Sequence, residues 1–215
     1  MNYDHVLLPS GVARTPSEVD DYLTAQQGLP QTEAVTAMAA IVDERNAALP
    51  EEDSFLADNA EVGGSATGSV LHVACPYDAI GHVRALLFEI GTPRGYALYD
   101  PQLAWLIDPA DRVEVTVSHG GAGEFPYLTE TLIHQWVPEL AEPNPYLIAE
   151  REPQHYIQTY RTAPGEFAVE YRDGGPDRHY ALTLTEPRDV AALIWAWARG
   201  DQATVDARTW ERVEF

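Results

Sequence analysis

The sequence predicts an α+β fold with two small domains, each a largely antiparallel sheet with helices packed on one face. Three observations lead to this prediction. Residues 1–110 alternate strand-like apolar runs with helix-like segments in the order βααβαβ. Residues 111–215 contain four short alternating runs in series, separated by turn residues, as in an antiparallel meander. The segment 187–199 then has an apolar stripe that predicts a C-terminal helix covering the meander.

In the first half, capping and turn residues mark the ends of the predicted elements. Thr15 and Glu18 have the spacing of a capping box, and Pro16 occupies the first helical position, so a helix is expected to begin there. Apolar residues at helical spacing predict two further helices, at 32–48 and 76–90. The remaining expectations are strands at 3–8, 69–74 and 96–99, a stretch at 103–107 that could add a further strand, and a surface loop at 51–68.

The second half is expected to begin with a strand at 111–118, because Val113, Val115 and Val117 alternate with polar residues. The glycine-rich stretch 119–123 predicts a flexible loop. The remaining expectations are a helix at 127–140, strands at 146–150, 155–160, 167–172 and 179–184, the helix at 187–199, and a last strand at 210–215.

The stretch EYRDGGPDRHY, residues 170–180, predicts a β-hairpin. Two runs with period-two alternation flank a cluster of Gly, Pro and Asp, which is a strong turn signal. A single buried face requires the apolar residues of both runs to lie on the same side of the sheet. These residues are Phe167, Val169, Tyr171, Tyr180, Leu182 and Leu184.

The opposite face of this hairpin carries Glu170, Arg172 and His179. The allowed pairings place His179 opposite either Glu170 or Arg172. A carboxylate beside an imidazole can perform acid–base chemistry, and the same pair also forms ordinary cross-strand ion pairs on solvated sheet faces. The row is therefore either a solvated surface or a partner-binding patch, since arginine is common among interface anchors.

Trp195 is a fourth candidate. Trp197 belongs to the apolar stripe of the helix at 187–199, whereas Trp195 lies about 160° away around that helix. Its side chain is expected either to cover another element or to be exposed at an interface. The candidate partner-binding residues are therefore Glu170, Arg172, His179 and Trp195.

The charge composition limits the classes of partner. The chain has 34 acidic residues, 13 arginines and no lysine, which gives a net charge of −21. Both halves are acidic, so nucleic acids and anionic membranes are expected to be repelled. A basic protein partner would be attracted, although the acidity is equally consistent with a role in solubility alone.

No motif predicts a catalytic residue, a cofactor or a metal site. Cys75 is the only cysteine, and the histidines show no metal-binding spacing such as HExxH. The stretch SHGGAG resembles an oxyanion-hole loop, but no Gly-x-Ser-x-Gly turn accompanies it. The start MNYDHVLLPSG lacks the features of a signal peptide, and no apolar run reaches the roughly 18 residues of a membrane span, so a cytoplasmic location is expected.

Several segments carry a family resemblance. MNYDHVLL, SVLHVACP and YALYDPQ together resemble uncharacterised actinobacterial proteins that begin with a Met-Ser-Tyr-Asp-like strand and end this domain at a Tyr-Asp-Pro-Gln turn. Residues 145–215, with YIQTY, EYRDG and DRHY, resemble the immunity proteins that accompany polymorphic toxins in the same bacteria.

The second resemblance implies a non-enzymatic, immunity-like protein that neutralises a toxin, and the acidity favours a basic toxin. The alternative is a hydrolase-type enzyme with a His/carboxylate site in the cleft between the two halves. A module that only homodimerises is a third hypothesis. The oligomeric state does not follow from the sequence.

Overall fold

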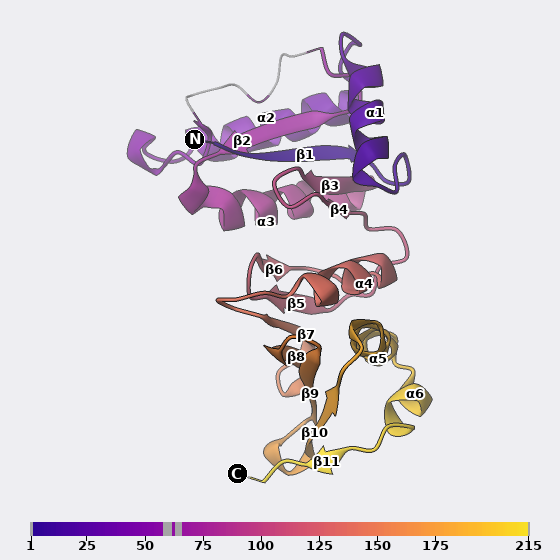
Figure 1. The fold of residues 1–215 in the computed structure, drawn as a ribbon. Coiled ribbons are helices and arrows are strands. Elements are labelled where there is room, and N and C mark those ends of the chain that lie inside the picture. The colour runs from indigo at the N-terminus through magenta and orange to yellow at the C-terminus, as the bar shows by residue number, and fades with distance from the viewer. Residues whose placement is uncertain (1, 58–61, 63–65, 215) are drawn as a thin grey trace. The chain divides into compact units, whose positions relative to one another are not determined.

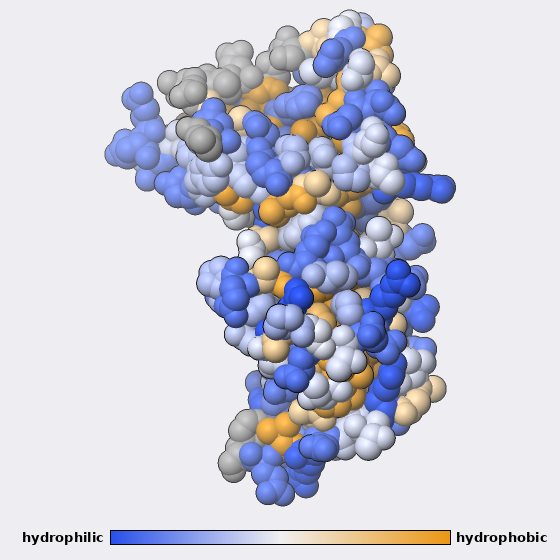
Figure 2. Space-filling view, in the orientation of Figure 1, coloured by the Kyte–Doolittle hydropathy of each residue, from blue (hydrophilic) through white to orange (hydrophobic). Residues whose placement is uncertain are grey.

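The computed structural model describes residues 2–57, 62 and 66–214. The chain divides into two compact units, Met1–Ala110 and Asp111–Phe215 (Figure 1). Within the described residues, the first unit has a four-stranded antiparallel sheet and the second a seven-stranded one, each with its own helices. These elements confirm the predicted α+β class. Hydrophilic residues dominate the surface seen in Figure 2, in keeping with the composition.

The first sheet is built around β1 (Tyr3–Pro9), which lies between two antiparallel neighbours. β2 (Leu71–Cys75) pairs with one edge of β1, and β3 (Tyr96–Asp100) pairs with the other. β4 (Trp105–Ile107) pairs with β3 and completes the order β2-β1-β3-β4. The helices are α1 (Pro16–Gln26), α2 (Glu33–Ala47) and α3 (Ile80–Gly91), with short helical turns at Glu51–Asp53, Tyr77–Ala79 and Thr92–Arg94.

Helices lie on both faces of this sheet, because adjacent residues of β1 point to opposite sides. Val6 and Leu8 form a buried cluster with Val19 of α1. Leu7 points the other way, toward α3, where a Cβ atom on Gly91 would lie 3.1 Å from its Cδ2 atom. The sequence predicted helices on one face. Three consecutive apolar residues in β1 instead require cover on both.

Two predictions for the first unit concern the start of α1 at Thr15 and the surface loop at 51–68. The helix start at Thr15 is confirmed, because its Oγ1 accepts a hydrogen bond from the backbone N–H of Glu18 at 3.2 Å. The carboxylate of Glu18 in turn accepts from the backbone N–H of Arg14. The predicted loop at 51–68 begins with the helical turn Glu51–Asp53, and its residues 58–61 and 63–65 lie outside the described part of the chain.

The second sheet has the strand order β11-β10-β9-β8-β7-β5-β6, with every neighbouring pair antiparallel. Its centre is the predicted meander, in which four strands pair in chain order. The strands are β5 (Thr116–His119), β6 (Gly123–Phe125), β7 (Tyr146–Glu152), β8 (His155–Ala163), β9 (Glu166–Asp173), β10 (His179–Leu184) and β11 (Glu211–Arg212). The helices are α4 (Glu130–Glu139), α5 (Pro187–Arg199) and α6 (Gln202–Asp206), and Pro176–Arg178 forms a short helical turn.

Two strands of this sheet, β5 and β11, are shorter than predicted. β5 begins at Thr116, and Val113 makes only an isolated bridge with Leu128. β11 comprises two residues where a strand at 210–215 was expected, and residue 215 lies outside the described part of the chain. Alternation of apolar residues alone therefore overestimated both strands, because pairing also requires a neighbouring strand with unpaired backbone groups.

The helix α5 covers one face of the meander and contacts β7, β8, β9 and β10 (Figure 1). Leu193 of this helix is fully buried, and so are Phe167 and Val169 of β9. The predicted ends of the helix are confirmed. Pro187 stands at the first helical position, and Gly200 ends the helix in the left-handed region with φ of 79°.

The register of the hairpin formed by β9 and β10 is the predicted one. Each apolar residue faces an apolar residue: Tyr180 faces Tyr171, Leu182 faces Val169, and Leu184 faces Phe167. His179 lies opposite Arg172, which decides between the two pairings that the sequence allowed. The ring of Trp210 packs edge-on against Tyr171, with 4.6 Å between the ring centroids, and closes the outer end of the apolar face.

The stretch 119–123, predicted as a flexible loop, is a hydrogen-bonded turn between β5 and β6. The backbone N–H of Ala122 donates to the carbonyl of His119 at 3.0 Å. The N–H of Gly121 donates to His119 Nδ1 at 3.1 Å, and the N–H of Gly120 donates to the carbonyl of Tyr146 at 2.9 Å. The bond from Gly120 ties the turn to β7, and a Cβ atom at Gly120 would overlap the backbone of Asn144, so this glycine allows close packing.

We predict that Gly120→Ala destabilises the protein by about 1–3 kcal/mol, because the new Cβ would overlap the backbone carbonyl oxygen of Asn144. The matched control is Gly121→Ala in the same turn, whose Cβ would lie 3.5 Å from the nearest atom, His119 Cε1. This change should stay within about 0.5 kcal/mol. Urea unfolding of both variants measures the difference, and equal free energies of unfolding would contradict the turn geometry.

Candidate functional site

One face of the second sheet lies away from α5, and we call it the open face (Figure 1). Its side chains alternate along each strand with the buried ones that face the helix, and all but one of them are half-buried or exposed. On the meander the open face consists of Tyr146, Ile148, Glu150, Tyr156, Gln158, Tyr160, Ala168, Glu170, Arg172, His179, Ala181 and Thr183, of which His179 is buried.

A chain of hydrogen bonds, which we call the polar row, crosses this face through Gln154, Arg172, His179, Glu170 and Gln158. The guanidinium of Arg172 donates to Gln154 Oε1 at 2.8 Å and to His179 Nδ1 at 3.0 Å. Glu170 Oε2 lies 3.1 Å from His179 Nε2 and accepts from Gln158 at 2.9 Å. Because a guanidinium only donates, Nδ1 of His179 accepts, and its Nε2 carries the hydrogen donated to Glu170.

Burial divides the polar row into a supporting part and an accessible part. The side chain of His179 is 5% exposed, whereas that of Glu170 is 33% exposed. The ring of Tyr156 lies beside them, with the guanidinium carbon of Arg172 5.5 Å from its centroid. Burial raises the pKa of Tyr156, and the positive charge of Arg172 opposes this effect. His179 therefore orients the carboxylate of Glu170, and Glu170 meets the solvent.

A groove of about 250 Å³ lies on the open face next to Glu170. Tyr146 and Tyr160 face each other across β7 and β8, and Gln158 faces Glu170 across β8 and β9. Tyr160 is 46% exposed. The groove is lined by Tyr146, Ile148, Gln158, Thr159, Tyr160, Ala168 and Glu170. It combines aromatic rings with one carboxylate, which is a chemistry suited to a cationic group.

The structure brings three of the four predicted site residues together. Glu170, Arg172 and His179 meet in the polar row. Trp195 is not part of it, because α5 lies on the other face of the sheet. The side chain of Trp195 is only 7% exposed, and the guanidinium carbon of Arg199 lies 5.6 Å from its ring centroid. A ring buried in this way presents little surface to a partner.

Sequence reasoning missed the residues that complete the groove, Tyr146, Gln158 and Tyr160. Each has the strand parity of the open face, so the alternation within 146–150 and 155–160 carried a signal. Using that signal required the register of β7 with β8 and that of β8 with β9. The first is interrupted by a bulge at Glu150/Glu152 and the second by a bulge at Arg161/Ala163, and the sequence pattern did not predict either one.

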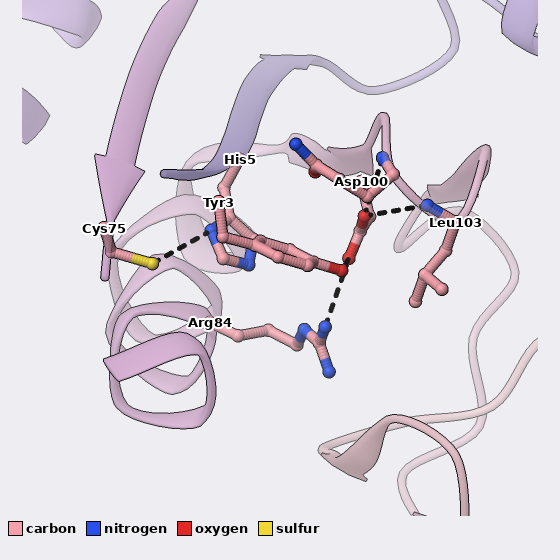
Figure 3. A network of polar contacts seen from close by, with 7 residues as sticks. Tyr3, His5, Cys75, Arg84, Asp100 and Leu103 are labelled. Atoms are coloured by element: carbon pink, nitrogen blue, oxygen red, sulfur yellow. Dashed lines mark hydrogen bonds and ion pairs between the residues drawn. The ribbon is translucent and has the colours of Figure 1, made fainter. Parts of the chain in front are cut away.

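A second polar cluster lies inside the first unit (Figure 3). Asp100 Oδ2 accepts hydrogen bonds from the hydroxyl of Tyr3 at 2.7 Å and from Arg84 at 3.1 Å. Asp100 Oδ1 accepts from the backbone N–H groups of Gln102 and Leu103, so Asp100 also stabilises the turn that follows β3. The side chains of Arg84 and Asp100 are 3% and 0% exposed, so this is a buried ion pair.

His5 and Cys75 lie at the other side of this cluster, with 4.0 Å between Nδ1 and Sγ. Burial lowers the pKa of His5 to about 4, and the charge of Arg84 acts in the same direction. Burial also raises the pKa of the Cys75 thiol to about 11. A neutral imidazole and a protonated, buried thiol make this pair unsuitable for nucleophilic chemistry, as expected for a cysteine that serves as a small apolar residue.

The described residues contain no group of three or more His, Cys, Asp or Glu side chains placed to hold a metal ion. In the same part of the chain, no helix has both the length and the apolar character needed to cross a bilayer. No protein-family model matches the sequence, and neither a curated protein nor a solved structure matches it. The resemblances noted from the sequence therefore stay predictions.

We predict that Asp100→Ala destabilises the protein by about 3–5 kcal/mol, because it leaves the buried Arg84 charge without its partner. Glu89→Ala is the matched control. It breaks the ion pair with Arg45, in which both side chains are more than half exposed, and should cost at most about 1 kcal/mol. Denaturant unfolding at neutral pH gives both values, and a small effect of Asp100→Ala would contradict the structural role of the pair.

We also predict that His5 makes the protein less stable in acid. Its pKa is about 4 in the folded protein against an ordinary value of 6.5, so the unfolded chain binds the proton first as the pH falls. Above about pH 6.5, His5 is neutral in both states and protonation does not lower the free energy of unfolding. Between about pH 6.5 and pH 4, the free energy of unfolding falls by up to about 3 kcal/mol, because only the unfolded chain binds the proton readily.

The variant His5→Gln isolates this contribution because glutamine does not titrate. The gap in unfolding free energy between the natural protein and the variant should shrink by up to about 3 kcal/mol between about pH 7 and about pH 4. Parallel curves for the two proteins over this range would refute the assignment.

Proposed function

We propose that this chain is a non-enzymatic, immunity-like protein that binds and neutralises a basic toxin in the cytoplasm. The observation that carries the proposal is the open face of the second sheet, where the polar row supports an accessible carboxylate beside an aromatic groove. An open sheet face with a small groove suits contact with a protein surface better than the binding of a small substrate, because small-molecule pockets usually enclose about 300–1,000 Å³.

The charge of the chain supports a basic partner. A net charge of −21 without any lysine would steer a basic protein toward the surface and disfavour nucleic acids. The accessible carboxylate of Glu170 would provide a local contact for such a partner. The similarity of residues 145–215 to immunity proteins supports the toxin as the kind of partner.

The alternative hydrolase would require a histidine that can take a proton from a substrate or from a nucleophile. Both ring nitrogens of His179 are engaged inside the protein, Nδ1 by Arg172 and Nε2 by Glu170. This engagement favours an orienting role over a catalytic one.

We predict that the immobilised full-length chain retains a basic protein from a lysate of the source cells. Retention should weaken as the salt rises from about 0.1 to about 1 M, because the Debye length falls from about 10 to about 3 Å. Replacing Glu170, Arg172 and His179 together by alanine should abolish it. Mass spectrometry identifies the bound protein, and a growth assay with its gene expressed alone or with this chain tests neutralisation.

The matched control replaces Glu44, Arg45 and Glu89, three exposed residues of the first unit, by alanine. It should bind as the natural protein does, and unfolding curves establish that both triple variants are folded. Retention that is unaffected by the Glu170, Arg172 and His179 substitutions would place the binding surface elsewhere. A captured protein that does not inhibit growth would refute the toxin assignment.

A further inference from the structure

We infer that the groove on the open face receives a single cationic side chain of the partner, and that it prefers arginine to lysine. This inference rests on the proposed function and specifies the chemistry of its contact. It follows from three features of the groove: hydrogen bonds to only one of the two Glu170 oxygens, two tyrosines at directly opposite positions of neighbouring strands, and the size of the groove.

Only one carboxylate oxygen of Glu170 accepts hydrogen bonds from the described residues. Oε2 accepts from both Gln158 and His179, whereas Oε1 accepts no hydrogen bond from a described residue. The buried ring of His179 and the amide of Gln158 hold the carboxylate in place, and Glu170 lines the groove. The carboxylate thus offers an oriented acceptor to a donor that enters from solvent.

The rest of the groove suits the flat face of a guanidinium. Tyr146 and Tyr160 are directly opposite residues of neighbouring strands, so their side chains emerge side by side next to Ile148. Tyr160 is 46% exposed, and it is the only large hydrophobic residue among the described residues of the second unit that is exposed. Tyrosine faces attract cations, and guanidinium groups stack on such rings better than ammonium groups do.

Size and charge favour a single cationic side chain over other classes of ligand. A volume of about 250 Å³ is below the usual range for small-molecule sites, about 300–1,000 Å³, and agrees with one inserted side chain. An anion would be repelled by Glu170, and an apolar side chain would leave its Oε1 without a donor. Arg172 does not line the groove, and its guanidinium is bound to Gln154 and His179.

The test uses two short peptides, acetyl-Gly-Arg-Gly-amide and its citrulline analogue, which has nearly the same shape without the charge. Each is titrated into the full-length protein with isotope-labelled tyrosines, and the NMR signals of the rings are followed. We expect the arginine peptide to shift the signals of Tyr146 and Tyr160 saturably and to bind about tenfold more tightly than the citrulline peptide. A lysine peptide should bind with intermediate affinity.

Two pairs of variants assign the contact. Glu170→Gln should weaken binding of the arginine peptide about tenfold, whereas Glu44→Gln, which removes the same charge from an exposed position in α2, should not change it. Tyr160→Ala should weaken binding by about three- to tenfold. The control Tyr77→Ala removes a ring of similar exposure, 53%, from the first unit and should have no effect.

Equal affinities for the arginine and citrulline peptides would overturn the inference, and so would equal effects of Glu170→Gln and Glu44→Gln. The outcome is separable from that of the proposed function. If a basic toxin is captured equally well by the natural chain and by Glu170→Gln, the groove inference fails and the proposed function stands. If the arginine peptide binds as expected but no basic protein is captured, the groove chemistry stands and the toxin assignment fails.

Discussion

The pairing register of β8, β9 and β10 is the constraint on which the second unit depends. A slip of one residue would turn Phe167 and Val169 to the open face and bury Glu170 against α5. The free energy gained by burying apolar side chains under the helix therefore selects one register. The same register places His179 opposite Arg172 and within reach of Glu170. Core packing thus assembles the polar row without any interaction specific to that row.

The two polar networks of the protein differ in how completely their carboxylates are satisfied. Asp100 accepts at least two hydrogen bonds on each oxygen, and its side chain is fully buried. Such a network organises the interior and has no capacity left for a ligand. Glu170 is partly exposed, and its protein contacts fall on Oε2. This difference is why the proposed binding site lies on the second sheet, whereas the Asp100 network in the first unit is structural.

Local sequence signals predicted the parts of the fold that depend on neighbours in the chain. The capping of α1 by Thr15, the ends of α5 and the parity of the β9–β10 hairpin all follow from residues a few positions apart. The buried pair of Arg84 and Asp100 carried no such signal, since one residue comes from a helix and the other from the end of a strand. The hydrogen bond between the N–H of Gly120 and the carbonyl of Tyr146 carried no such signal for a similar reason, because the two residues are distant in the sequence.

The fold class, the hairpin with its two faces and the acidic charge of the chain follow from the amino-acid sequence alone. These properties depend on period, turn chemistry and composition, which are local or additive along the chain. Contacts between distant segments were needed to bring Tyr146, Gln158 and Tyr160 to one groove with Glu170, and to bury Trp195 on the other side of the sheet. Those outcomes depend on strand register, bulges and helix docking. Such features arise when distant segments compete to bury apolar surface and to satisfy their backbone hydrogen bonds.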